Sequence, residues 1–287
     1  MADTISKSSW VIIDKIIKNA LEEDIGSGDI TTTSLIPEDS VSSASLTAKS
    51  GFILAGLPFA KRTFELVDKD LKFKTLKKEG SHVKARTVVA TIKGSTSSLL
   101  TAERTALNIL QRVSGIATLT NEYVKVVKGL RTRIVDTRKT APGLRVFDKY
   151  AVKTGMGTNH RFGLFDGVLI KDNHIAAAGG VSKAIKLVRG KAHHLLKIEV
   201  EVKNIKEVKE AISACADIIM LDNMQHDKIK KSVDIIRKNA PSITIEASGN
   251  VSLETVRRIA ETGVDLISIG ALTHSAQAAD ISLKFES

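Results

Sequence analysis

Residues 198–223 read IEVEVKNIKEVKEAISACADIIMLDN and hold one complete strand–helix–strand unit. Apolar runs rich in β-branched residues stand at its two ends, KIEVEV from residue 197 and DIIMLD from residue 217. Between them, NIKEVKEAISA spaces its apolar residues as an amphipathic helix does. A strand, a helix and a second strand in succession are typical of a βαβ unit, whose strands run parallel. The stretch therefore predicts a parallel sheet with helices packed against it.

The same alternation continues over the second half of the chain. Further short runs of this kind begin at residues 133, 167, 243 and 265, and helical stretches such as MQHDKIKKSVDIIRKN and SLETVRRIAETG separate the later ones. About six parallel strands are too few for a complete eightfold barrel, so we predict an open, incomplete α/β barrel. A doubly wound open sheet is the alternative.

The first half of the chain has a different pattern. Ser8 or Ser9 is expected to cap a helix that runs to about Leu21. Residues 44–94 read as short strands joined by turns. A strongly amphipathic helix, SSLLTAERTALNILQRVSG, follows and is expected to end at Gly115. The two halves therefore predict two domains of unequal size or one enlarged barrel domain.

Composition limits the kinds of protein this chain can be. With 43% hydrophobic and 26% charged residues, the chain of 287 residues is typical of a soluble globular protein. Its one cysteine, Cys215, excludes a disulfide framework, fits a cytoplasmic location and is expected to be buried. We expect no secretory signal and no membrane span. The net charge of +11 suits nucleic acid or small anions, but 4% aromatic residues leave little for base stacking.

Polar and charged side chains follow each predicted strand at its carboxyl end, which is where barrel enzymes build their active sites. These residues are Arg138, Lys139, Lys171, Asp172, Asn173, His174, Asp222, Asn223, Ser248, Gly249, Asn250 and Gly270. A single charged strand end is commonly a solvated loop, but six in a row at one edge predict a functional site.

Residues of two kinds at this edge suit a phosphorylated substrate. Ser248–Asn250 precede a helix expected to start near Ser252, and Gly270 stands in a matching place, which favours phosphate binding. Glu201 and Asp222 are oxygen donors at neighbouring strand ends and suit Mg²⁺ held together with substrate phosphates. Glu199 shares a strand face with Glu201, and the pattern leaves open whether it serves the site, faces solvent or pairs with a lysine.

Basic residues between positions 131 and 161 suit a carboxylated substrate. Arginine and lysine far outnumber acids there, and arginine grips a carboxylate with two hydrogen bonds. The sequence therefore predicts that a small polycarboxylate binds where Arg138, Lys139, His160, Arg161 and Lys171 converge.

Several motifs together resemble the quinolinate phosphoribosyltransferase family, also called nicotinate-nucleotide pyrophosphorylase (carboxylating). They run in order over nearly the whole chain: EDIGSGDITT (23–32), ERTALNILQRVSGIAT (103–118), DTRKTAPGLR (136–145), KYAVKTGMGTNHRFGLFDGVLIKDNH (149–174), IEVEV (198–202), LDN (221–223), EASGN (246–250) and GVDLISIGALTHS (263–275). The combination DTRKT, NHR and KDNH is highly specific. A related family associated with molybdenum transport shares parts of DTRKT and HR, but the intact KDNH argues against it.

The resemblance implies an α/β fold with an N-terminal α+β sandwich and an open barrel of about six parallel strands. We assign residues 1–115 to the sandwich, with the tail 271–287 packing back on it, and residues 116–270 to the barrel. The resemblance further implies a cytoplasmic homodimer that joins quinolinate to 5-phosphoribosyl-1-pyrophosphate with Mg²⁺, releasing pyrophosphate and CO₂ in NAD biosynthesis. Nucleic acid and membranes are not expected as partners.

Residue roles follow from the same resemblance. Lys139, Glu201 and Asp222 are expected to be catalytic, and Glu201 and Asp222 to face Mg²⁺. Quinolinate is expected at Arg138, Lys139, His160, Arg161 and Lys171, with Arg104 reaching across from the partner subunit. The phosphoribosyl pyrophosphate site is expected to comprise Lys139, Lys171, Asn173, His174, Glu201, Asp222, Ser248, Gly249, Asn250, Ser268 and Gly270. Met156 stands where many members have a glycine, so it must point away from the substrate or be accommodated by its loop.

Overall fold

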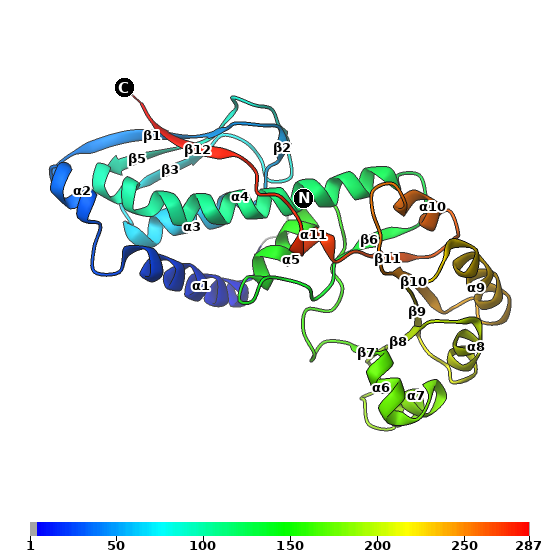
Figure 1. Cartoon of the computed structure of the whole chain (residues 1–287). Coiled ribbons are helices and arrows are strands. Elements are labelled where there is room, and N and C mark those ends of the chain that lie inside the picture. Colours follow the sequence, from blue (N-terminus) through cyan, green and yellow to red (C-terminus); the bar gives the residue numbers. More distant parts are fainter. Residues whose placement is uncertain (1–4, 287) are drawn as a thin grey trace. The chain divides into compact units, whose positions relative to one another are not determined.

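The chain forms two compact units, drawn in Figure 1 as a computed structural model that describes residues 5–286. The first unit comprises Met1–Asn121, Thr140–Met156 and Leu272–Ser287, and the second comprises Glu122–Lys139 and Gly157–Ala271. The predicted domains divide instead at residue 115 and place residues 140–156 with the barrel. Residues 1–4 of the predicted first domain lie outside the described part.

An antiparallel sheet organises the first unit, with the strand order β12-β1-β5-β3. Its strands are β1 (Val41–Ala48), β3 (Lys72–Thr75), β5 (Val88–Ser95) and β12 (Ile281–Phe285). Strand β12 pairs antiparallel with β1, so a segment near the C-terminus completes a sheet built mainly from residues 41–95. A separate small pair joins β2 (Phe52–Ile53) to β4 (His82–Val83).

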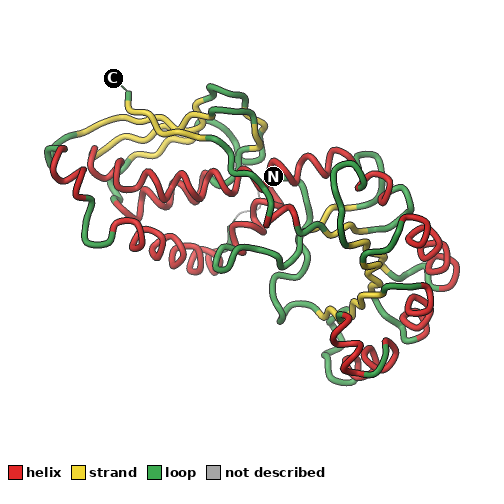
Figure 2. The backbone as a smooth tube through the Cα atoms, viewed as in Figure 1, coloured by secondary structure: helices red, strands yellow, loops and turns green. Residues whose placement is uncertain are grey.

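The first unit contains the helices α1 (Lys7–Ile25), α2 (Ile30–Leu35), α3 (Leu57–Val67), α4 (Thr96–Val126) and α5 (Arg145–Thr154). Of these, α3 and α4 pack against the sheet and close its core (Figure 2), and α1 packs on α3. The core fills with apolar side chains from the sheet, α3 and α4, among them Leu46, Phe64 and Leu99, each fully buried. An α+β layer of this kind is what the sequence predicts for the N-terminal part.

Three details of the first unit correct the sequence prediction. Helix α1 begins earlier than expected, because the side chain of Ser6 accepts the Ser9 N–H and caps it. The break after α1 holds a short helix, α2, capped by Asp29, whose carboxylate accepts the Thr32 N–H. Residues 57–67, read as strand and turn, form α3, which begins after the left-handed Gly56.

Helix α4 continues through Gly115, where the sequence predicts its end. A Cβ atom at this glycine would lie 2.0 Å from the carbonyl oxygen of Gln277, so the position serves close packing with the C-terminal segment. Apolar residues continue beyond the glycine, with Ile116 and Ala117 buried, and this packing holds the helix together. Tertiary contact thus outweighs the tendency of glycine to end a helix.

The second unit is an open sheet of six parallel strands in the order β6-β11-β10-β9-β8-β7. They are β6 (Arg133–Val135), β7 (Val168–Ile170), β8 (Ile198–Val202), β9 (Ile218–Asp222), β10 (Thr244–Ser248) and β11 (Leu266–Ser268). All six runs singled out in the sequence form strands. Because β6 and β7 do not pair with each other among the described residues, the barrel is incomplete, as predicted.

Helices join these strands and follow the outer side of the curved sheet (Figure 1). They are α6 (Asp172–Ala178), α7 (Val181–Arg189), α8 (Ile205–Ser213), α9 (His226–Asn239) and α10 (Val256–Ala260). A short helix after β11, α11 (Ala271–His274), falls almost entirely within the first unit. None of the helices in residues 5–286 is long and apolar enough to cross a membrane.

The prediction that Cys215 is buried is wrong, since the side chain is exposed. Cys215 comes directly after the C-cap of α8 and has a φ of 57°. The N–H of Ala216 donates back to the Ala211 carbonyl, which closes the helix with a left-handed residue at Cys215. The apolar pattern around the cysteine suggested burial, but helix termination turns this side chain outward.

Candidate active site

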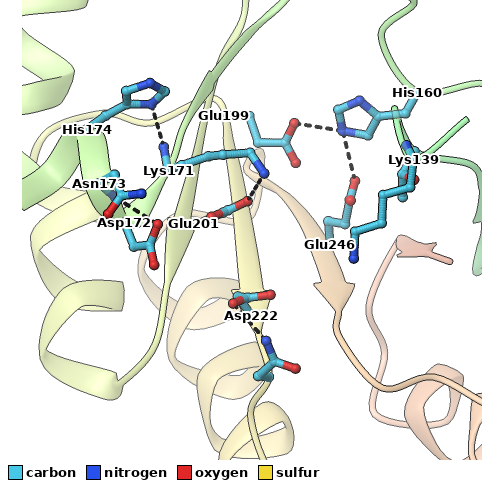
Figure 3. A network of polar contacts seen from close by, with 12 residues as sticks. Lys139, His160, Lys171, Asp172, Asn173, His174, Glu199, Glu201, Asp222 and Glu246 are labelled. Atoms are coloured by element: carbon cyan, nitrogen blue, oxygen red, sulfur yellow. Dashed lines mark hydrogen bonds and ion pairs between the residues drawn. The ribbon is translucent and has the colours of Figure 1, made fainter. Parts of the chain in front are cut away.

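The carboxyl ends of the parallel strands bring the predicted polar residues to one edge of the second unit. Ser248 of β10 is in register with Asp222 of β9 on one side and with Ser268 of β11 on the other. Glu201 of β8 is in register with Met220, one row deeper than Asp222. The edge therefore presents carboxylates and hydroxyls from adjacent strands, and Figure 3 shows the acidic members together with their partners.

Glu201 and Lys171 form an ion pair at this edge, with 3.4 Å between Nζ and Oε1. Burial raises the pKa of Glu201, while Lys171 acts in the opposite direction and Asp222 adds to the rise. The carboxylates of Glu201 and Asp222 therefore repel each other. The Asp222 carboxylate also accepts a hydrogen bond from the side chain of Asn223 at 3.0 Å.

Oxygen ligands of this kind fit a magnesium ion. Glu201 and Asp222 offer carboxylate oxygens from neighbouring strands, and their mutual repulsion is relieved by a shared cation. Neither is fully buried, so substrate oxygens and water can complete the coordination. The residues present therefore fit the ion that the sequence suggests.

A second group of acids lies deeper in the barrel, around His160. The ring Nε2 is 3.0 Å from Glu199 Oε2 and 3.8 Å from Glu246 Oε2 (Figure 3). Glu199 is 4% exposed and Glu246 is 1% exposed, so both carboxyl groups are shielded from water. Glu199 therefore faces the interior beside His160, and the alternatives left open for it, solvent or a lysine, do not apply.

Burial raises the pKa of Glu246 to about 8, and the negative charge of Glu199 adds to the rise. His160 and the hydroxyl of Ser268 act in the opposite direction. No hydrogen bond of good geometry reaches either oxygen of Glu246 from the described residues, although Ser268 and Glu199 lie close enough to shift its pKa. Ser268, expected at the substrate phosphates, is 3% exposed and lies on this inner group.

Both the backbone N–H and the guanidinium group of Arg161 are held by hydrogen bonds within its own loop. Its backbone N–H donates to His160 Nδ1 at 2.8 Å, and its guanidinium Nη1 donates to the Gly167 carbonyl at 2.8 Å. Burial lowers the pKa of Arg161, and the neighbouring guanidinium of Arg138 lowers it further. Glu199, Asp166 and Glu201 act against this shift. Two arginines thus repel each other in a partly buried place, which favours the binding of an anion.

Lys171 to His174 form the start of α6 rather than an irregular loop. The Lys171 N–H donates to His174 Nδ1 at 3.0 Å, which closes the first turn. Asp172 pairs with Lys203 at 2.8 Å, while Asn173 and His174 are exposed. The polar residues 171–174 after β7 are therefore ordered by hydrogen bonds and an ion pair of their own.

Gly249 allows the loops after β9 and β10 to approach closely. It has a φ of 95°, and a Cβ atom there would lie 2.1 Å from Asn223 Oδ1. The Asn223 N–H donates to the Ser248 carbonyl at 2.9 Å, and Asn250 Nδ2 lies 3.3 Å from Asn223 Oδ1. Helix α10 begins at Val256, not near Ser252 as expected, because a turn intervenes. Gly270, by contrast, directly precedes α11.

The remaining predicted residues lie on surfaces. Lys139 is exposed in the loop after β6 and is drawn near His160 in Figure 3. Arg104 is exposed on α4 in the first unit. Met156 has a φ of 72° and is 73% exposed, so the chain accommodates it with its side chain outward. Sequence reasoning gave no role to Glu246 and left that of Glu199 open, although alternation already put Glu199 on the face of Glu201.

Comparison with known proteins covers nearly all of the chain. Residues 29–114 match the family model for the quinolinate phosphoribosyl transferase N-terminal domain, and residues 116–284 match its C-terminal domain. The chain is 48% identical to the probable nicotinate-nucleotide pyrophosphorylase (carboxylating) of Synechocystis sp., over 96% of this chain and 93% of the relative. It is 44% identical to the Bacillus subtilis protein of the same description, over 94% and 92%. Among solved structures, the nicotinate-nucleotide pyrophosphorylase from Francisella tularensis matches with a TM-score of 0.91 and 41% identity, over 100% of both chains.

Proposed function

Since the chain belongs to the quinolinate phosphoribosyltransferase family, we propose that the carboxyl edge of its parallel sheet is the active site of that family's reaction. The chain is a phosphoribosyltransferase of NAD biosynthesis. It transfers the phosphoribosyl group of 5-phosphoribosyl-1-pyrophosphate to quinolinate with decarboxylation. The products are nicotinate mononucleotide, pyrophosphate and CO₂.

The observation that supports this site best is the proximity of Arg138 and Arg161. Burial lowers the pKa of the half-buried Arg161 guanidinium, and the charge of the neighbouring Arg138 lowers it further. The Nε of Arg138 is buried without a hydrogen-bond partner among the described residues. A dicarboxylate would relieve the repulsion and supply acceptors for both guanidinium groups. Quinolinate has this chemistry, and Lys139, Lys171 and His160 complete its proposed site.

Orientation is the first task of this site. An arginine clamp on the quinolinate carboxylates would hold the pyridine nitrogen against C1 of the ribose, and such positioning can supply much of the rate enhancement. As pyrophosphate departs, positive charge develops around C1, where the carboxylates of Glu201 and Asp222 would stabilise it. Lys139 is proposed to stabilise the charge on the leaving pyrophosphate.

Decarboxylation then needs no separate cofactor. Once its nitrogen is bonded to ribose, the pyridine ring carries a positive charge. This charge stabilises the carbanion that remains when the adjacent carboxylate leaves as CO₂. A proton taken up at the same carbon completes nicotinate mononucleotide. The clamp must therefore hold the ring through both steps.

The second substrate is proposed to bind along the strand ends from β7 to β11. Its 5-phosphate would lie at the backbone N–H groups of Ser248, Gly249, Asn250 and Gly270, with Ser268 beneath them. Lys171, Asn173 and His174 would face the pyrophosphate. Mg²⁺ would be held by Glu201 and Asp222, where it would neutralise the charge of the phosphate groups.

A homodimer is proposed to complete the quinolinate site. Arg104 is exposed on a helix of the first unit, where a lone charge is commonly a solvated side chain. In the family it reaches across a dimer interface, and we assign it that role here. In a symmetric dimer the two sites would each need residues from both chains. The cytoplasmic location stays a prediction.

One assay tests the reaction. Purified protein with quinolinate labelled in the carboxylate lost as CO₂, 5-phosphoribosyl-1-pyrophosphate and Mg²⁺ should release labelled CO₂ and nicotinate mononucleotide in equal amounts. Nicotinate in place of quinolinate is the matched control and should give little product, because it lacks one carboxylate of the pair. Product without CO₂ release, or equal use of nicotinate, would refute the proposed reaction.

A further inference from the structure

His160 has every polar group of its ring engaged inside the second unit. Its Nδ1 accepts the Arg161 N–H at 2.8 Å, and its Nε2 lies 3.0 Å from Glu199 Oε2. Its backbone N–H also donates to the buried carboxylate of Asp136 at 2.8 Å. The side chain therefore links the interior acids to the peptide group of Arg161.

These contacts decide which ring nitrogen carries the hydrogen. A backbone N–H can only donate, so Nδ1 must present its lone pair to Arg161. The ring hydrogen is then on Nε2, where it is donated to Glu199. The hydrogen-bond network therefore fixes the tautomer of the His160 ring.

One ring hydrogen faces two buried acids. Glu246 Oε2 is 3.8 Å from Nε2, which is too far for a hydrogen bond. The ring nitrogen and one carboxylate oxygen from each glutamate all lie within 4.8 Å of one another. Glu199 Oε2, at 3.0 Å, is therefore the acceptor of the ring hydrogen, and Glu246 is not.

A histidine and two glutamates could also hold a metal ion, but the tautomer argues against it. A metal on Nε2 needs a lone pair there, which would put the ring hydrogen on Nδ1. That hydrogen would point at the Arg161 N–H, where the two donors would collide. In this arrangement Nε2 carries a hydrogen and has no lone pair to offer a metal ion.

We propose that Glu199 is a positioning residue for the substrate carboxylate site, acting through His160 on Arg161. This rests on the proposed function of the site. Glu199 orients the ring, the ring holds the Arg161 peptide, and the Gly167 carbonyl holds the guanidinium at 2.8 Å. Arg161 is thereby oriented for a carboxylate before the substrate binds. This reduces the conformational entropy that binding would otherwise cost. His160 serves quinolinate through Arg161, because its own ring nitrogens are engaged.

Kinetics of Glu199 variants test this chain of contacts. Glu199→Leu removes the acceptor and leaves the ring N–H unpaired, so the KM for quinolinate should rise about tenfold or more. The KM for 5-phosphoribosyl-1-pyrophosphate should change by less than about threefold, since Arg161 does not bind it. Glu199→Gln keeps an acceptor of the same shape and should restore most of the quinolinate affinity. Glu261→Leu, at an exposed glutamate on the outer side of the unit, is the matched control.

Two kinetic results would overturn the proposal. Equal increases in both KM values would indicate general damage to the fold. A Glu199→Gln variant as impaired as Glu199→Leu would show that the acceptor is not what matters. Because the glutamine variant preserves shape, it remains informative if the leucine variant does not fold.

The tautomer can be read without any activity. Nitrogen NMR of protein labelled in its 7 histidines, with His160→Gln to assign the signal, should show a bare Nδ1 and a protonated Nε2 for His160 at neutral pH. A protonated Nδ1 would overturn the proposal. A wild-type protein that cannot use quinolinate would instead refute the proposed function, and the tautomer would still be measurable.

Discussion

Replacing Glu246 with glutamine should make the protein more stable at alkaline pH and change little at acid pH. In the native protein, burial and the neighbouring Glu199 raise the pKa of Glu246 from 4.5 to about 8. Glutamine has the shape of the protonated acid and does not titrate. The variant therefore removes the titration of the side chain while keeping its volume.

The sign follows from where the proton is held. Below about pH 4.5, both folded and unfolded chains keep the Glu246 proton, so ionisation has no effect on stability. Between about pH 4.5 and about pH 8, the unfolded chain loses the proton while the folded chain keeps it. The free energy of unfolding therefore falls as the pH rises through this window, and the full penalty remains above it. At about 1.36 kcal/mol per pH unit, the upper limit is about 5 kcal/mol, and because Glu199 is coupled to the titration we expect about 2–5 kcal/mol.

Thermal unfolding at fixed protein concentration, at about pH 5 and about pH 8.5, measures this difference. The Glu246→Gln variant should melt at least about 4 °C above the wild type at the higher pH and within about 2 °C of it at the lower. Glu261→Gln, an exposed glutamate paired with Arg257, controls for loss of a surface charge. The reasoning would be refuted by a stabilisation that is equal at both pH values or larger in acid.

The site predictions concern binding, turnover and assembly. Arg161→Ala should weaken quinolinate binding by about 2–5 kcal/mol without unfolding the protein; unchanged affinity in a calorimetric titration would remove the residue from the site. Asp222→Asn should lower kcat far more than it weakens quinolinate binding, and turnover within about twofold of wild type would rule out its charge-stabilising role. Gly249→Ala places a Cβ 2.1 Å from a side-chain oxygen at a φ of 95°, so the KM for 5-phosphoribosyl-1-pyrophosphate should rise while quinolinate binding is retained. Mixing inactive Arg104→Ala and Lys139→Ala proteins should restore activity at about a quarter of all sites if the dimer shares its sites, whereas no rescue after proven subunit exchange would argue against sharing.

Periodicity was sufficient to predict the parallel sheet, because each strand is a short apolar run between helices. It was less informative in the first unit, where α3 was read as strand and turn. The first turn of that helix contains Pro58, and its preceding Gly56 is left-handed. Both residues usually mark turns, and here they mark the start of a helix instead. Gly115 misled in the same way, since its contact with Gln277 connects parts of the chain far apart in sequence.

The outer edge of the site was predictable because its residues follow the strands directly, and parallel topology brings these positions together. The inner group of His160, Glu199 and Glu246 could not be predicted in this way. Glu246 belongs to β10 and Glu199 to β8, and β9 lies between these strands. Only the strand order and the curvature of the sheet bring the two acids to one imidazole. The sequence shows Glu246 as the one acid of β10 and Glu199 as one of two acids on β8, and either is equally consistent with a solvated side chain or a salt bridge.

The proton on Glu246 also matters for the charge that a substrate meets. Arg138 and Arg161 can attract a dicarboxylate only if the acids nearby do not cancel their charge. Lys171 already pairs with Glu201 at 3.4 Å, and Glu199 acts on Arg161 from inside the barrel. A second ionised glutamate beside Glu199 would add a negative charge in a region poor in water, where charges interact strongly. By keeping Glu246 neutral, the barrel retains one interior charge to orient His160 and leaves the arginines with an excess of positive charge for the substrate. Quinolinate affinity of the wild type should therefore fall as the pH rises past about 8, and the Glu246→Gln variant should lose this component of the decline.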